Sequence, residues 1–303
     1  MGEINKVPLI NKVYSKLVWR LQELYNLPLD VRIQILKKSL RKSVTERTSF
    51  SDDVEGYRAI CKLAVEDESI FKVFKRSSDY RGIVENVTRN IGQECLNIIK
   101  KEGKDLLEYF PRFQKNDLFG NPITFKYDVG RFSPTTLRYI KILAELRNIF
   151  SNLNNFNIVE IGCGYGGQCK IISDVISYKS YAIVDLGYVI PLIKKYLSKF
   201  DIENISYIEL NQINNDDNFD LVISNYAFSE CKKTVQDEYI KKFLNKSRRG
   251  YITYNYDRES GSNFPYSKKE AIERLSGMHD IMVMEERPKT GAHNCIITWD
   301  DRK

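Results

Sequence analysis

The sequence predicts an α/β fold: a mostly parallel sheet with an antiparallel last strand, plus an N-terminal helical extension. Three observations lead to this prediction. From residue 157 onward, short apolar runs typical of buried strands alternate with helical patterns. A glycine-rich turn at 162–166 follows the first of these runs. The last two strand patterns are separated by only a short connection, as in a hairpin that closes a set of βα units.

The first part of the chain, residues 1–110, is predicted to be a helical domain. Apolar residues recur at helical spacing within 13–27, 31–40, 54–74 and 80–101, and no strand pattern interrupts them. Residues 1–50 hold ten basic and four acidic residues, so this segment accounts for +6 of the net charge of +7. Such a run is usually a solvated helix face; the alternative is attraction to an anionic partner.

Residues 111–133 form an aromatic connection with several turn signals. Because long connections in compact domains are often functional, we predict a lid here, with simple packing between domains as the alternative. The third part, 134–303, is the predicted cofactor-binding domain. It begins with a helix at 134–150, which Ser133 caps and Pro134 starts.

The sheet domain is predicted element by element from the same periodicities. Strands are expected at 157–161, 181–185, 205–210, 219–225, 249–255, 280–286 and 294–299. Helices are expected at 166–177, 189–199 and 234–246.

The glycine turn marks the candidate cofactor site. Glu160, Gly162, Gly164 and Gly166 are spaced E-x-G-x-G-x-G, which lets backbone N–H groups approach a nucleotide-like ligand. Asp185 ends the next strand, 23 residues after Gly162, where a carboxylate accepts hydrogen bonds from ribose hydroxyls. This pair alone suits a nicotinamide dinucleotide as well as S-adenosylmethionine (SAM), and a tight turn without a ligand is the third alternative.

Three features together favour SAM: the glycine spacing, the terminal hairpin, and the polar end of the strand at 219–225. They resemble class I SAM-dependent methyltransferases, which have a Rossmann-like fold. The resemblance implies a seven-stranded sheet whose seventh strand is antiparallel and lies between the fifth and sixth. It also implies that Glu160 and the three glycines shape the methionine side of the pocket, that Asp185 holds the ribose, and that 209–211, including Leu210, approach the adenine.

Within that class, a set of blocks resembles the sugar O-methyltransferases of bacterial surface-polysaccharide clusters. The blocks span roughly residues 110–300, and they lie at 130–134, 160–166, 184–186, 224–230, 250–255 and 294–299. The resemblance implies methylation of a sugar or a sugar-derived group, on a polysaccharide or its nucleotide-linked precursor. The first hundred residues carry no matching motif.

The acceptor side is expected where the parallel strands end, because ligands of such sheets bind there. The segment 225–231 therefore faces the acceptor, with Asn255 and Tyr256 on the rim. Because an antiparallel last strand starts at this same edge, His293 is expected to face the site. We further expect Asn225 to contact the cofactor and Arg131 to pair with the SAM carboxylate.

A sugar hydroxyl needs alignment with the methyl group and a group that accepts its proton. His293 is the first candidate base, because its ordinary pKa is near neutral pH, and Glu230 is the second. The alternatives are a surface-turn histidine and a solvated helix charge. Tyr226 and Asn255 are expected to orient the acceptor or SAM.

Several functions lose support from what the sequence lacks. It has neither the Asn/Asp-Pro-Pro-Tyr signature of DNA amino-methyltransferases nor the Pro-Cys pair that attacks pyrimidines, so nucleic acid is not the expected substrate. Six cysteines without a CxxC pair and only two histidines favour no metal site; Asp220, Glu230 and Asp257 are the alternative ligands. The sequence shows neither a signal peptide nor a long apolar run. We therefore expect a cytoplasmic protein without a membrane span.

The sequence thus predicts a SAM-dependent O-methyltransferase with a small polar or saccharide substrate, including an anionic one. Methylation of RNA or of another small molecule, and SAM binding without catalysis, are the alternatives. The oligomeric state is left open.

Overall fold

The computed structural model describes residues 49, 55–209, 218–256 and 264–301. Contacts divide the chain into two compact units, 1–45 and 46–303, and every described residue belongs to the second. The boundary that we expected at residue 110 therefore falls inside this unit. No helix among the described residues is long and apolar enough to cross a membrane.

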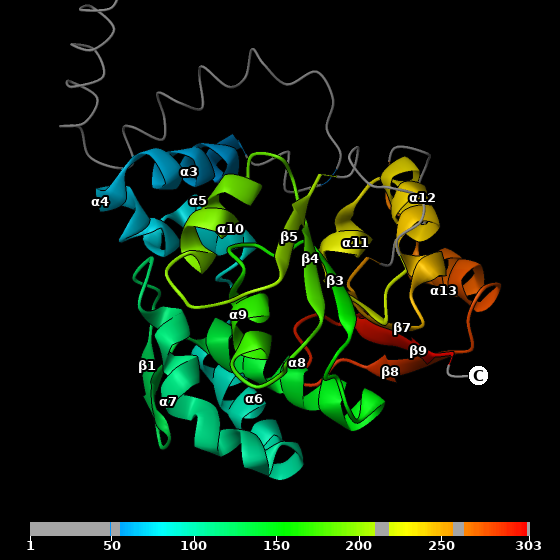
Figure 1. The fold of residues 1–303 in the computed structure, drawn as a ribbon, viewed down its shortest axis with the longest axis horizontal. Coiled ribbons are helices and arrows are strands. Elements are labelled where there is room, and N and C mark those ends of the chain that lie inside the picture. The colour runs from blue at the N-terminus through cyan, green and yellow to red at the C-terminus, as the bar shows by residue number, and fades with distance from the viewer. Residues whose placement is uncertain (1–48, 50–54, 210–217, 257–263, 302–303) are drawn as a thin grey trace, which may run out of the picture. The chain divides into compact units, whose positions relative to one another are not determined.

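The main sheet has seven strands in the order β5-β4-β3-β6-β7-β9-β8 (Figure 1). All pairs are parallel except those of β9, which runs antiparallel to both β7 and β8. The strands are β3 (Asn157–Ile161), β4 (Ser180–Val184), β5 (Ile205–Ile208), β6 (Leu221–Asn225), β7 (Arg249–Tyr254), β8 (Ile281–Glu285) and β9 (Cys295–Asp300). The predicted fold class is confirmed, with the reversed last strand between the fifth and sixth.

The central strands are buried on both faces, which is why they read as apolar runs. Ile158, Val159 and Ile161 of β3 are at most 1% exposed, and Ile161 pairs with Val184 of β4. Burying each such side chain contributes about 1.5–3 kcal/mol. This rigid centre fixes where the strands end, and hence where the residues that follow them lie.

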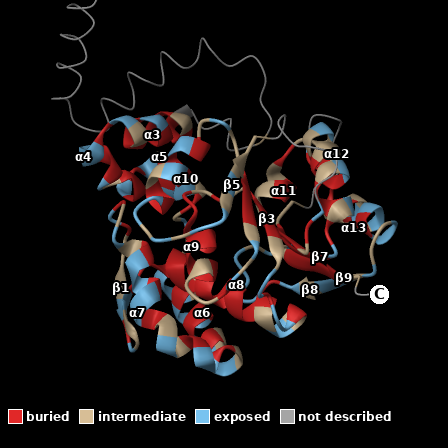
Figure 2. Cartoon of the chain, in the orientation of Figure 1, coloured by how far each residue is buried: buried red, intermediate tan, exposed pale blue. Residues whose placement is uncertain are grey.

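Helices cover both faces of the sheet: α9 and α10 lie on one side, and α12 and α13 on the other (Figure 1). Figure 2 shows that α9 is almost entirely buried, whereas α10, α12 and α13 have buried inward faces and exposed residues on their outward faces. The bounds are α8 (Pro134–Phe150), α9 (Gly167–Ser173), α10 (Ile190–Leu197), α11 (Ala227–Glu230), α12 (Lys233–Lys242), η6 (Leu244–Lys246) and α13 (Lys268–Ser276). Neither α11 nor α13 was predicted.

The predicted helix at 134–150 is α8, with the same bounds. Ser133 caps it, because its Oγ accepts a hydrogen bond from the Thr136 N–H at 3.1 Å. Asp117 in turn accepts hydrogen bonds from the Ser133 N–H and Oγ. Nearly all of α8 is buried, because it packs against both α6 and α9.

The predicted helices at 13–27 and 31–40 lie outside the described residues, and the described helices before α8 are shorter than predicted. They are α3 (Glu55–Glu66), α4 (Glu68–Phe71), η2 (Phe74–Arg76), α5 (Ser78–Ile83), α6 (Arg89–Glu102), η3 (Lys104–Tyr109), α7 (Phe110–Phe113) and η4 (Gln114–Asp117). The expected helix at 80–101 is interrupted at 84–88, where Thr88 caps α6 by accepting from the Ile91 N–H at 3.3 Å. This interruption forms part of the candidate site.

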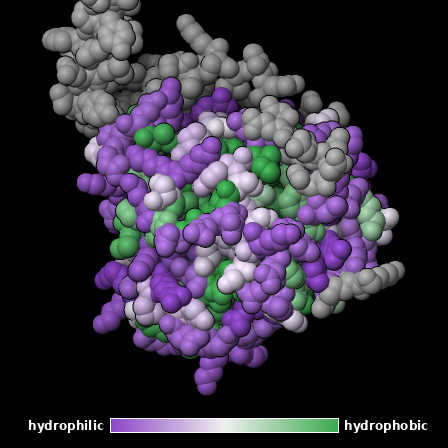
Figure 3. All heavy atoms as spheres, in the orientation of Figure 1, coloured by the Kyte–Doolittle hydropathy of each residue, from purple (hydrophilic) through white to green (hydrophobic). Residues whose placement is uncertain are grey.

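The aromatic connection ends in a small hairpin of β1 (Phe125–Tyr127) and β2 (Gly130–Phe132). Tyr127 and Phe132 are buried, and the Phe132 ring lies 5.2 Å from that of Phe110. These aromatic side chains therefore fill a local core. Figure 3 shows that polar residues cover most of the viewed face, with only small apolar areas between them.

Candidate active site

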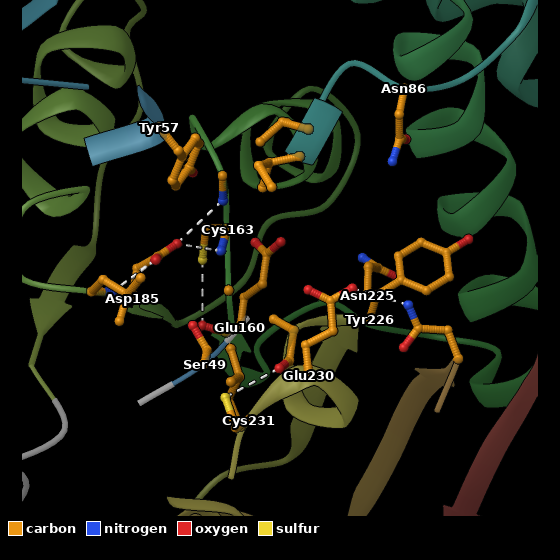
Figure 4. A pocket seen from close by; sticks show the side chains of 18 of the residues that line it. Ser49, Tyr57, Asn86, Glu160, Cys163, Asp185, Asn225, Tyr226, Glu230 and Cys231 are labelled. Atoms are coloured by element: carbon orange, nitrogen blue, oxygen red, sulfur yellow. Dashed lines mark hydrogen bonds between the residues drawn. The ribbon is translucent and has the colours of Figure 1, made fainter. Parts of the chain in front are cut away.

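A cavity of about 970 Å³ opens at the carboxyl ends of β3, β4, β6 and β7 (Figure 4). Its lining includes the segments 160–164, 185–187, 225–227 and 289–291. Further lining residues come from α3, from the 83–91 region, and from α8 and α12. The cavity thus lies where parallel sheets bind ligands, and it joins parts of the chain that are far apart in sequence.

The glycine turn forms one wall and needs glycine for its backbone. Gly162 has a φ of +76°, and a Cβ there would lie 2.0 Å from the Cβ of Ala227. Gly164, at +60°, also lines the cavity. Gly166, at +90°, lies outside the lining formed by the described residues; it precedes α9 and faces Leu197. Gly162 and Gly164 are therefore the two of these glycines that line the cavity.

Asp185 lines the cavity and also shapes the glycine turn. Its Oδ2 accepts hydrogen bonds from the backbone N–H groups of Cys163 at 2.7 Å and Gly164 at 3.2 Å. Its Oδ1 accepts from the Leu186 N–H at 2.7 Å. One carboxylate thereby fixes the ends of two adjacent strands relative to each other.

Glu160 lies beneath the same turn and is 2% exposed. Burial raises the pKa of this carboxyl to about 7, while the Tyr181 hydroxyl donates to its Oε2 at 2.6 Å and opposes the shift. Glu160 also contributes to the cavity wall.

Glu230 and Asn255 form a hydrogen-bonded pair on the opposite wall. The Asn255 Nδ2 donates to the Glu230 Oε1 at 3.0 Å, and the Asn255 Oδ1 accepts from the Ser229 Oγ at 2.6 Å. Burial raises the pKa of Glu230 above its ordinary value, although the bond from Asn255 lowers it. Both residues line the cavity, whereas Tyr256 packs against the hydrophobic core outside the lining of described residues.

Tyr226 follows β6 with a φ of +69°, in a region that non-glycine residues rarely adopt. Its hydroxyl donates to Glu286, which also accepts from the Thr290 N–H at 3.0 Å and the Asn294 Nδ2 at 2.9 Å. Burial is the main cause of a raised Tyr226 pKa, so the phenol stays protonated near neutral pH. Tyr226 is therefore suited to orienting a ligand and not to accepting a proton.

Two buried donors in the lining have no hydrogen-bond partner among the described residues: the Nδ2 of Asn225 and the Nε of Arg138. The Arg138 Nη2 donates to the Val84 carbonyl at 3.4 Å, which turns the guanidinium toward the interrupted helix. Buried polar groups normally have partners, so these donors fit acceptor atoms of a ligand. The sequence analysis missed Arg138, since no motif distinguishes it from other residues of α8.

Several predicted residues lie elsewhere. Arg131 is exposed, and its Nη1 donates to the Thr124 carbonyl at 3.3 Å. His293 is exposed, and its carbonyl accepts from the Lys268 Nζ at 3.2 Å. Neither residue is part of the lining, and no residue of 111–133, all of which are described, contributes to it. Leu210, Asn211 and Asp257 lie outside the described residues, whereas Glu209 does line the cavity.

The acidic residues of the site do not gather into a metal-ligand set within the described residues. Asp220 directly precedes β6, and its Oδ2 accepts from the Asn157 N–H at 2.9 Å. This contact ties β6 to β3 and leaves Asp220 with a structural role.

The sheet order and the single reversed strand are those of the Rossmann-like fold of class I methyltransferases. No protein-family model matches this chain, and no curated protein matches it.

Solved structures similar to this chain include methyltransferases. The methyltransferase domain of bacterial CtHen1 has a TM-score of 0.41 at 15% identity, over 54% of this chain and 97% of that chain. For TehB from Haemophilus influenzae the TM-score is 0.40 at 15% identity, over 53% of this chain and 62% of TehB. The N-terminal domain of EvdMO1, solved with SAH and D-fucose, has a TM-score of 0.43 at 11% identity, over 54% of this chain and 82% of that domain.

Proposed function

We propose that this protein is a SAM-dependent methyltransferase that methylates an oxygen of a sugar or another small polar molecule. The observation that carries the proposal is a single cavity. It joins the positive-φ turn at Gly162 and Gly164, the Asp185 carboxylate and the buried Glu230. A nucleotide-like ligand and a hydroxyl acceptor would meet between these walls.

The residues present fit SAM. Asp185 would accept hydrogen bonds from the ribose hydroxyls, and the backbone at Gly162 and Gly164 allows the methionine portion to approach closely. The unpartnered donors of Asn225 and Arg138 suit its carboxylate. Bound SAM supplies a methyl group activated by a sulfonium cation, and the acidic side chains of Glu160 and Glu230 suit that charge.

In this proposal Glu230 accepts the proton of the acceptor hydroxyl. Its carboxylate has one oxygen held by Asn255, and a general base of this kind contributes about 10²–10⁴-fold. Tyr226, with its proton directed to Glu286, presents oxygen lone pairs that orient the acceptor. Alignment contributes the larger share, up to about 7–11 kcal/mol for well-oriented reactants. His293 has no role in this scheme.

Radiolabelled methyl transfer tests the proposal. The full chain is incubated with methyl-labelled SAM and, separately, with free sugars, nucleotide-linked sugars, bacterial polysaccharide and RNA. We expect labelled product with one of the saccharide classes, and lower yield from Glu230→Gln. Labelling of RNA alone would contradict the proposed substrate, and SAM binding without transfer to any acceptor would favour a binding protein. We also expect activity to survive EDTA.

A further inference from the structure

Lys75 is a buried cation that the proposed chemistry does not use. It lies in η2, its side chain is 0% exposed, and it is not part of the cavity lining. Lysine is almost never fully buried unless it is paired, because removing its charge from water is costly. The contacts that accompany this burial show which parts of the site Lys75 connects.

Lys75 contacts the glycine turn through Tyr165 and Asn116. Its Nζ lies 3.5 Å from the ring centroid of Tyr165, which stands between Gly164 and Gly166, and it donates to the Asn116 carbonyl at 3.2 Å. The Asn116 Nδ2 donates to the Tyr165 hydroxyl at 3.0 Å. Cation–π attraction and this hydrogen bond therefore hold the same ring from two directions.

The other contact of Lys75 leads to the interrupted helix. Its Nζ lies 3.9 Å from the Oε1 of Glu85, whose side chain is 5% exposed. Glu85 stands between Val84 and Asn86, and both of these line the cavity. Val84 also faces the glycine turn, since a Cβ on Gly164 would lie 3.1 Å from its Cγ1. The Lys75 ammonium group thus contacts two segments that form walls of the cavity, although Lys75 itself does not line it.

Burial opposes the charge on Lys75. Burial lowers the pKa of Lys75 to about 8 and raises that of Glu85. Because the folded protein binds this lysine proton less tightly than the unfolded chain does, the ionised form subtracts from stability at pH values below about 8. The geometry of these contacts, and not the pKa shift, is what relates Lys75 to the cavity.

We propose that Lys75 is a positioning residue of the cofactor pocket, which holds the glycine turn through Tyr165 and the 84–86 wall through Glu85. The inference rests on the proposed function, because the ligand between these walls is taken to be SAM. Removing the charge should loosen both walls and weaken cofactor binding, without lowering the stability of the fold.

The test compares S-adenosylhomocysteine (SAH) affinity with stability in the full chain. Calorimetry gives the SAH dissociation constant, and urea unfolding at pH 7 gives the midpoint, for Lys75→Met and for the double variant Lys75→Met/Glu85→Gln. The double variant avoids leaving the Glu85 carboxylate without its cation. Lys72→Met, on the exposed C-cap of α4, is the matched control.

We expect SAH affinity to fall about tenfold or more in both Lys75 variants, with the unfolding midpoint of the double variant unchanged or higher. Lys72→Met should match the wild type in both measurements. SAH affinity within twofold of wild type in both Lys75 variants would overturn the inference. So would an affinity loss in the double variant that merely follows a loss of folded protein. If the wild type itself binds no SAH, the proposed function fails instead.

Discussion

At the residue scale, Glu230 carries the proposed chemistry, and its environment explains why. Burial raises the pKa of its carboxyl, so its conjugate acid is weaker and its carboxylate a stronger base than those of an exposed glutamate. Asn255 donates a hydrogen bond to one of its oxygens, and Glu230 lines the cavity. Once Glu230 is protonated it cannot act as a base, so the rate of methyl transfer should depend on pH.

Replacing Glu230 with Gln keeps its size and removes the base. We predict a loss of about 10²–10⁴-fold in kcat with SAH affinity preserved, measured by labelled methyl transfer and calorimetry. In the wild type, kcat/KM should rise as pH increases through the raised pKa of Glu230. Glu273→Gln, an exposed member of an ion pair with Lys269 on α13, is the control. Full activity of Glu230→Gln would remove this residue from the mechanism.

Sequence position predicted some of these side chains and not others, for a physical reason. Glu160, Asp185, Asn225 and Glu230 line the cavity because each stands at a strand end or in the short helix directly after one, and parallel strands end at one edge. His293 stands in a turn, where a single residue step reverses a side chain: its neighbour Asn294 lines the cavity and it does not. No spacing rule fixes that choice.

At the element scale, the glycine turn is the most constrained segment of the site. Its backbone is fixed by Asp185, and its glycines have positive φ values. At Gly162 the conformation and the space both exclude a side chain, since the missing Cβ would overlap Ala227. The turn therefore packs the end of β3 closely against α11.

We predict that Gly162→Ala destabilises the protein by at least about 2 kcal/mol, from left-handed backbone strain together with overpacking against Ala227. Gly82→Ala in α5 is the matched control, because a Cβ there meets nothing within 4 Å. It should stabilise by roughly 0.5–1 kcal/mol, as alanine favours helix. Urea unfolding measures both, and equal midpoints would contradict the account.

The long apolar elements could be predicted closely, whereas the short ones could not. Strand β3 and helix α8 have the predicted bounds, because burial on both faces imposes an apolar run or an uninterrupted helical pattern. Helix α13 was missed although Ser267 and Glu270 form a capping box that the sequence displays. The break at 84–88 was missed, although Thr88 caps the helix that follows it. Its tertiary contacts, Lys75 with Glu85 and Arg138 with the Val84 carbonyl, cannot be predicted from spacing.

At the scale of the whole molecule, the site depends on contacts between distant parts of one unit. Arg287, beside the cavity loop at 289–291, forms two hydrogen bonds with the Glu102 carboxylate of α6, at 2.9 and 3.0 Å. The helices before α8 are thus part of the pocket's framework. No residue of the predicted lid at 111–133 lines the cavity, and Phe132 of this segment packs against Phe110 of α7.

The division at residue 45 leads to a prediction for a shortened chain. Residues 46–303 form a compact unit, so a chain of these residues alone should unfold cooperatively and retain SAH affinity within about threefold of wild type. Calorimetry and urea unfolding measure both properties. Loss of SAH binding in a folded chain of 46–303 would show that the first 45 residues belong to the cofactor site.

The central claim is that the cavity binds SAM, and direct titration by calorimetry tests it. We predict that the full chain binds one equivalent of SAM or SAH and does not bind NAD⁺. Asp185→Asn should lower the affinity for SAH by about tenfold or more, since hydrogen bonds to a charged group contribute about 1.5–3 kcal/mol. Binding of NAD⁺ in place of SAM, or no binding of either SAM or SAH, would contradict the account.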